Sequence, residues 1–130
     1  MKQDVTRDLL KCLFMALLLI MVFTSVQDRI GIAIDLQQER CLKGSPWLFV
    51  ILKGALTLNR GDLVAFQSDR RMESHYPVGT HFIKRIEAIH TDTFSSPQYW
   101  VVGDHPRSYD SRAFGAIDEA QLIGKAYALF

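Results

Sequence analysis

The chain has 130 residues, enough for one small domain and little more. Its formal net charge is +1 and its basic residues are scattered, so charge gives no reason to expect a nucleic-acid-binding protein. The apolar residues are spread unevenly, and the N-terminal region is the clear outlier.

Residues 12–23 form a continuous apolar run near the N-terminus. Leu9, Leu10 and Val26 extend it to about 18 residues, close to the roughly 20 apolar residues that a bilayer span requires. Basic residues precede the run, which favours a cytoplasmic N-terminus with the rest of the chain outside.

Two other interpretations of this segment are less consistent with the sequence. A cleaved signal peptide needs a small-residue cleavage site, and Thr24-Ser25-Val26 is a poor match. A buried core helix that is apolar on all sides is hard to enclose in so small a domain. We therefore expect residues 1–27 to be a cytoplasmic N-terminus with a transmembrane signal anchor, and residues 28–130 to be an extracytoplasmic domain.

Short runs of aromatic, aliphatic and β-branched residues follow, separated by turns rich in glycine and proline, as in a mainly β domain. The sequence predicts a small β-barrel or sandwich after the transmembrane helix. The expected strands are 30–34 (or a helix extension), 47–52 (buried or in contact with lipid), 63–66, 81–89, 99–102 and 124–130, with a solvated loop at 67–76 and one helical turn at 118–122.

Lys84 lies in the strand that alternates most regularly. Alternation places its side chain on the same face as Phe82 and Ile86, which are apolar. One interpretation is a surface lysine on an edge strand. The other is an amine that points into an apolar site, where burial disfavours the charged form and makes a neutral amine available as a general base.

A dense group of polar residues follows the strand at 99–102. Gly103-Asp104-His105-Pro106 is a turn signal, and four hydrogen-bonding residues then precede Phe114-Gly115. These four residues are Ser108, Asp110, Ser111 and Arg112. So much hydrogen-bonding capacity directly after a buried strand indicates a polar site held on a rigid frame.

Residues 99–115, the strand together with the turn and the polar group, resemble the last conserved box of the type I signal peptidases. The Gly-Asp-x-Pro form of the turn is similar to the conjugative-transfer (TraF-like) branch of that family. The stretch Phe82-Ile-Lys-Arg-Ile86 is similar to the lysine box of the same family. The resemblance implies a small signal-peptidase-like β-barrel or sandwich as the catalytic domain.

The resemblance also implies a role for each matching residue. Lys84 would be the general base, and Ser108 would hydrogen-bond to it and orient it. Asp110 and Arg112 would pair to brace the loop, and Asp104 would support the turn. Such supporting bonds fix the rotamer of a catalytic side chain.

The nucleophile is where the sequence departs from the family. The family places a serine shortly after the anchor, and here Cys41-Leu42 occupies that place, with Ser45 four residues later. A thiol ionises far more readily than a hydroxyl, so a cysteine needs less activation. We expect Cys41 to be the nucleophile, with Ser45 as the alternative. If Cys41 has no catalytic role, it would be a small, buried, apolar residue.

Taken together, the resemblance implies a membrane-anchored protease with a Cys/Lys dyad in place of Ser/Lys. It would be a single-pass protein of the bacterial inner membrane with its catalytic domain in the periplasm. Its partners would be the lipid bilayer and an exported precursor such as a conjugative pilin, which it would cleave or cyclise. The alternative is a catalytically inactive assembly subunit of a conjugation or secretion apparatus. No cofactor is expected, and the four histidines show no metal-ligand spacing.

Overall fold

The computed structural model describes residues 2–35, 41–44, 46–54 and 57–130. The chain divides into two compact units, Met1–Ile30 and Gly31–Phe130. This division lies close to the expected boundary between the anchor and the extracytoplasmic domain.

The first unit is one long helix, α1 (Lys2–Arg29). Its segment Val5–Arg29 is long and apolar enough to cross a membrane, and none of its most apolar stretch is buried within the structure. The core helix of a soluble domain would be mostly buried, so the exposure of these side chains argues against that interpretation.

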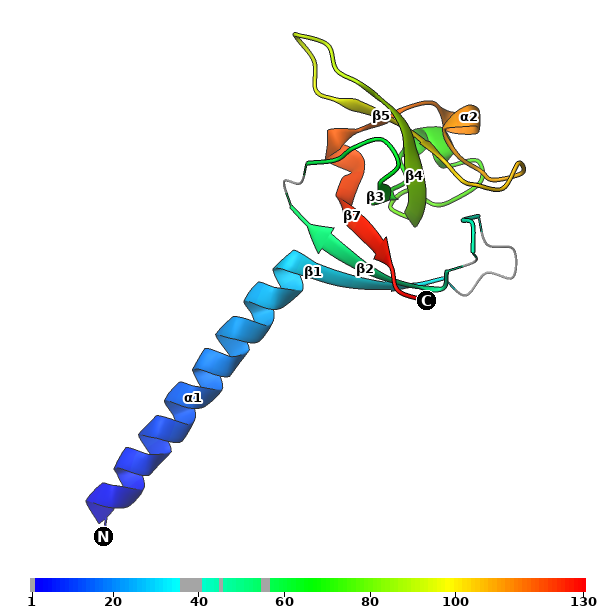
Figure 1. Ribbon diagram of the computed structural model, residues 1–130. Helices are drawn as coiled ribbons and strands as arrows, with labels where there is room; N and C mark the ends of the chain where they lie inside the picture. The colour runs from blue at the N-terminus through cyan, green and yellow to red at the C-terminus, as the bar shows by residue number, and fades with distance from the viewer. Residues whose placement is uncertain (1, 36–40, 45, 55–56) are drawn as a thin grey trace. The chain divides into compact units, whose positions relative to one another are not determined.

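The second unit is mostly β, as predicted (Figure 1). Its elements are β1 (Ile30–Ile34), β2 (Leu48–Lys53), β3 (Leu63–Gln67), η1 (Arg70–Met72), β4 (His81–His90), β5 (Gln98–Val102), α2 (Ser111–Phe114), β6 (Ile117–Asp118), η2 (Glu119–Gln121) and β7 (Leu122–Ala128).

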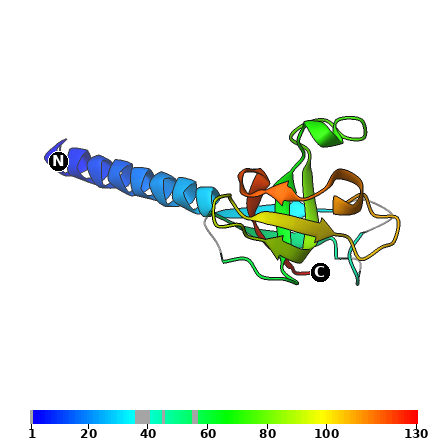
Figure 2. The ribbon, with the colours of Figure 1, turned by 90° about the horizontal axis from the view of Figure 1, so that it is seen from above.

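The seven strands form one sheet in the order β1-β2-β7-β3-β4-β5-β6. The sheet is antiparallel and curls into a half-barrel, so its strands do not lie in one plane (Figures 1 and 2). The last strand, β7, pairs with both β2 and β3 and therefore lies in the middle of the sheet. Gly124 permits this approach, because a Cβ atom there would lie 2.0 Å from the carbonyl oxygen of Leu52.

Alternation along β3 divides the core into two clusters. Val64 and Phe66 point to one side and pack in the larger cluster with residues of β4, β5 and α2. Ala65 points to the other side and packs with Ile51 and Ala126. Both faces of β3 are buried, as expected for a central strand.

The alternation predicted for residues 81–89 holds only over the first part of β4. Ile86 pairs with Val101 but Ala88 pairs with Trp100, so the register shifts at Glu87. This irregularity has the pattern of a β-bulge, in which an extra residue on one strand has no partner. Ala88 therefore does not continue the alternation expected from Ile86.

Two further expectations need correction. Residues 67–76, expected to be a solvated loop, contain η1, and its Met72 is fully buried. The rest of this loop projects away from the sheet in Figure 2. The strand expected at 47–52 is β2, which begins one residue later. Within it Phe49 is only 1% exposed and therefore cannot contact lipid, whereas the preceding Trp47 is exposed.

Candidate functional site

Lys84 is a buried lysine on the central strand β4. It pairs with Val64 of β3, and its side chain is only 4% exposed. Its Nζ donates a hydrogen bond to Ser108 Oγ at 2.7 Å. The structure therefore places the amine in the protein interior, and the edge-strand interpretation of Lys84 is wrong.

Cys41 lies beside the turn that follows β5. Its carbonyl oxygen accepts hydrogen bonds from the backbone N–H groups of Asp104 at 2.6 Å and His105 at 3.2 Å. Its thiol is free and half-buried, and the neighbouring Leu42 is buried. The alternative nucleophile, Ser45, lies outside the described residues.

Gly103 is the point where the two candidate segments meet. A Cβ atom on Gly103 would lie 2.1 Å from Ser108 Oγ and 3.2 Å from the Cβ of Cys41. The absence of a side chain therefore lets Cys41 approach Ser108, which accepts the hydrogen bond from Lys84. Three segments distant in sequence come together at this glycine.

Asp104 connects the turn to two other segments. Its Oδ1 accepts from Arg85 Nε and its Oδ2 from Arg85 Nη2, both at 3.2 Å, and Oδ2 also accepts from the Lys43 backbone N–H at 2.7 Å. The hydrogen bonds from Arg85 lower the pKa of Asp104, partial burial opposes them, and the N–H of Lys43 lowers it further. The carboxylate is therefore ionised at neutral pH.

Asp110 is fully buried and organises the loop that carries Ser108. It caps α2 by accepting from the Arg112 N–H at 3.1 Å, and it also accepts from the Gly103 N–H at 2.9 Å and from Arg112 Nε at 2.8 Å. Burial opposes ionisation of Asp110, but these hydrogen bonds outweigh it and lower the pKa. The next residue, Ser111, accepts from the Val101 N–H at 2.9 Å, which ties the same loop to β5.

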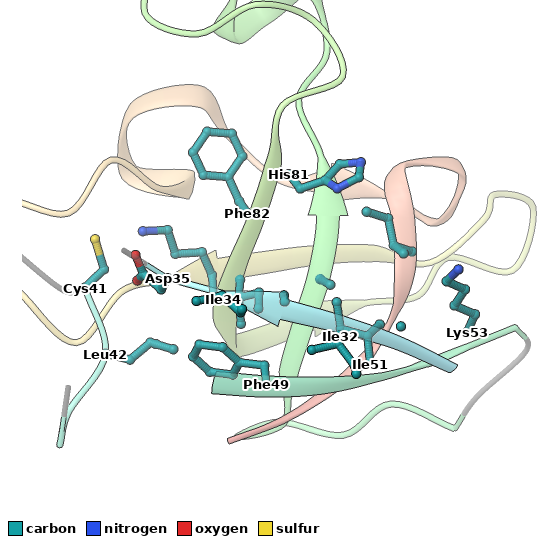
Figure 3. A pocket seen from close by; sticks show the side chains of 16 residues that line it. Ile32, Ile34, Asp35, Cys41, Leu42, Phe49, Ile51, Lys53, His81 and Phe82 are labelled. Carbon is teal, nitrogen blue, oxygen red and sulfur yellow. The ribbon is translucent and has the colours of Figure 1, made fainter. Parts of the chain in front are cut away.

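A cavity of about 720 Å³ lies next to this constellation, and Cys41 and Lys84 both contribute to its wall. The rest of the wall is mainly apolar and comes from β1, β2, β3, β4 and β7. Figure 3 shows Cys41 and Asp35 at one end of the cavity and Lys53 at the other. A cavity of this size, with a mainly apolar wall and a few polar groups, is typical of a ligand-binding site.

Sequence reasoning missed two contributors to the site. Asp35 lines the cavity, but its position at the end of a short apolar strand gave no sign of this. Arg85 follows Lys84 directly, so alternation could place it on the opposite face, but its pairing with Asp104 depends on the tertiary fold. Among the described residues, no three His, Cys, Asp or Glu side chains are grouped so that they could hold a metal ion.

Comparison with known protein families gives one match. Residues 88–130 match the family model described as signal peptidase, peptidase S26. The match includes Ser108, Asp110 and Arg112, but neither Lys84 nor Cys41 lies within it. No curated protein matches the chain significantly. The match covers about a third of the chain, so what it shows is that the C-terminal part, residues 88–130, is similar to signal peptidases of the S26 family.

Proposed function

We propose that this chain is a membrane-anchored signal-peptidase-like endopeptidase with Cys41 as nucleophile and Lys84 as general base. The observation that carries the proposal is the position of Lys84. Its amine is buried beside Ser108, and it lines the same cavity as the thiol of Cys41. A buried lysine without a task is unfavourable, because burying an amine carries a desolvation penalty.

The proposed reaction begins with transfer of the Cys41 proton to Lys84. The thiolate attacks the scissile carbonyl carbon and forms a C–S bond. Lys84 then donates its proton to the leaving amine as the C–N bond breaks, which leaves a thioester on Cys41. Lys84 takes a proton from water, and the resulting hydroxide attacks the thioester. The C–S bond then breaks to release the acid, and the departing Cys41 thiolate takes the proton back from Lys84, which regenerates the enzyme.

Each supporting residue has a defined part in this scheme. Ser108 accepts a hydrogen bond from Lys84 and so fixes the direction of the amine. Asp110 and Arg112 hold the loop that carries Ser108. Backbone N–H groups, including that of Cys41 itself, would have to stabilise the oxyanion.

Signal peptidases act on exported precursor proteins, so we infer an exported precursor as substrate. By resemblance to the conjugative-transfer branch, the substrate is a pilin or another conjugation protein. An amine from the product could replace water as the second nucleophile, and the outcome would then be cyclisation. The proposed setting is the bacterial inner membrane, with α1 as a single-pass anchor and the second unit in the periplasm.

Maturation of a co-expressed exported pilin precursor tests the enzyme proposal. We expect the Cys41→Ala and Lys84→Met variants to leave the precursor uncleaved, and Ser45→Ala to process it normally. Lys84→Arg should also fail, because a guanidinium does not give up its proton. Cys41→Ser should retain reduced but detectable turnover.

The same variants separate the proposal from its alternatives. Normal processing by Cys41→Ala together with failure of Ser45→Ala would make Ser45 the nucleophile. Normal conjugation or secretion in both single variants and in the double variant would show that the chain is a structural subunit. Near-normal processing by Lys84→Met would remove Lys84 from the mechanism.

A further inference from the structure

The loop between β3 and β4 is closed at its base by one buried side chain. Ser68 is only 3% exposed, and its Oγ donates to the Pro77 carbonyl oxygen at 2.7 Å and accepts from the Thr80 N–H at 2.9 Å. The N–H of Tyr76 donates to the carbonyl oxygen of the fully buried Met72 at 2.9 Å. The backbone of Tyr76 is therefore fixed next to the core.

Five aromatic rings form a closed circuit that joins this loop to the sheet and to the loop that carries Ser108. Each ring contacts the next, with centroids between 5.0 and 6.2 Å apart, a range in which aromatic pairs attract one another. The aromatic circuit runs in order through Phe66, Phe82, Tyr76, Tyr109 and Phe114, and back to Phe66. Because the circuit is closed, each ring is held from two sides.

Tyr76 contacts a neighbour of each partner in the hydrogen bond between Lys84 and Ser108. Phe82 precedes Lys84 by two residues on β4, and Tyr109 follows Ser108 directly. The ring of Tyr76 lies edge-on to Phe82, with centroids 5.0 Å apart, and is tilted against Tyr109 at 5.3 Å. The strand that carries the donor and the loop that carries the acceptor are thus joined a second time, through a side chain of a third segment.

We propose that Tyr76 is a positioning residue that holds Ser108 against the amine of Lys84. This inference rests on the proposed function in taking Lys84 as the general base. Tyr76 is not among the described residues that line the cavity, so it acts through Phe82 and Tyr109. It should therefore affect proton transfer much more than substrate binding.

The two partners of Tyr76 differ in how much they depend on it. Phe82, which lines the cavity, is also stacked on the fully buried Phe66 at 5.7 Å, so the cavity wall should survive loss of the Tyr76 ring. The other described ring contacts of Tyr109 are with Phe114 and His75, and neither of these rings has a described contact with Phe82. Loss of Tyr76 should therefore loosen Tyr109, and with it the adjacent Ser108, relative to β4.

The test is the rate at which formaldehyde and a borohydride methylate the Lys84 amine in the full-length protein in detergent, measured by peptide mass spectrometry. The amine is only 4% exposed and bound to Ser108, so it should react slowly in the wild type. Tyr76→Leu should accelerate methylation by about tenfold, because loss of two aromatic contacts favours local opening. Tyr76→Phe should react at the wild-type rate, since the described contacts of Tyr76 with Phe82 and Tyr109 are made by its ring.

A double-variant comparison separates positioning of Ser108 from packing alone. Ser108→Ala removes the acceptor directly and should also accelerate methylation of Lys84. In the Ser108→Ala background, Tyr76→Leu should change the rate by less than about twofold, because the hydrogen bond that it protects is already absent. A role limited to packing would give the same acceleration in both backgrounds.

Tyr127 provides a matched control on β7 of the same domain. Its ring lies 5.7 Å from Lys125 Nζ and makes no described contact with the aromatic circuit. Tyr127→Leu removes the same atoms as Tyr76→Leu and should leave the methylation of Lys84 unchanged. If circular dichroism shows that Tyr76→Leu does not fold, Tyr76→Met replaces it, because a flexible side chain fills the space without supplying a ring.

Precursor cleavage provides the functional measurement. Tyr76→Leu should lower kcat by about tenfold and change KM by less than about twofold, whereas Tyr76→Phe and Tyr127→Leu should behave as the wild type. A higher KM with an unchanged kcat would assign Tyr76 to substrate binding and overturn the proposal.

Three methylation results would also overturn the proposal. These are an unchanged rate in Tyr76→Leu, an unchanged rate in Ser108→Ala, and an equal effect of Tyr76→Leu with and without Ser108. Failure of the proposed function has a different signature. In that case Lys84→Met would still process the precursor, while methylation of Lys84 in the otherwise intact chain still depended jointly on Tyr76 and Ser108.

Discussion

Replacing Asp110 with alanine should destabilise the domain far more than replacing Arg112, its partner in the ion pair. Asp110 is fully buried, whereas the side chain of Arg112 is 47% exposed. Without the carboxylate, the buried Gly103 N–H loses its acceptor, which costs about 1–3 kcal/mol. The lost N-cap of α2 costs about 1 kcal/mol more. We therefore expect the free energy of unfolding to fall by about 2–4 kcal/mol in Asp110→Ala.

Urea unfolding of the full-length protein in detergent, followed by tryptophan fluorescence, measures this loss. A loss of this size should lower Tm by more than about 10 °C in a domain of about 100 residues. Arg112→Met should cause a clearly smaller loss, because Asp110 keeps two backbone donors. Equal losses in the two variants would show that the exposed ion pair, and not the buried backbone hydrogen bonds, stabilises the loop.

The pH dependence of the same variants provides an independent check. Because the pKa of Asp110 is lower in the folded state, its contribution to stability is complete above the unfolded pKa of about 3.9 and is lost as pH falls through the folded value. Asp110→Asn should therefore lose less stability than the wild type between neutral pH and strong acid. Parallel curves for the two proteins would contradict the assigned shift.

Three other predictions concern the site and the anchor. Lys84→Met should leave the free energy of unfolding unchanged or raise it, as measured by urea titration, because an apolar chain replaces a buried amine. Gly103→Ala should abolish precursor cleavage and lower Tm, since its Cβ would lie 2.1 Å from Ser108 Oγ. A reporter fused after Phe130 should be active only outside the cytoplasm, and the N-terminus of the mature protein should be retained; a mature chain that begins near Gln27 would indicate a cleaved signal.

Local patterns in the sequence predicted those parts of the structure that local interactions control. The apolar run predicted α1, because a helix satisfies its backbone hydrogen bonds within the segment. The strand expected at 99–102 is β5, with one more residue at its start, and the turn expected at 118–122 contains η2. Alternation in the first part of β4 placed Lys84 on a face with Ile86, and both are buried.

Local patterns did not predict which distant segments would meet; the contact between Lys84 and Ser108 was implied only by the family resemblance. β7 is the last strand of the chain, yet it lies between β2 and β3. Asp104 accepts from an amide 61 residues away, and nothing in the residues around Lys43 indicates this partner. The burial of Met72 was not predicted, because Met72 lies in a charged stretch of sequence. Its burial depends on packing against the core and not on local composition.

The amino-acid sequence by itself therefore determined the membrane-length helix, most strand positions and the residue types available for chemistry. These follow from side-chain periodicity and backbone preference, which act over a few residues. Only the tertiary structure decided that Lys84, Ser108 and Cys41 converge at Gly103 and that Asp104 joins their segments. Such contacts form when the sheet curls and buries its apolar faces, and that process depends on the whole domain at once.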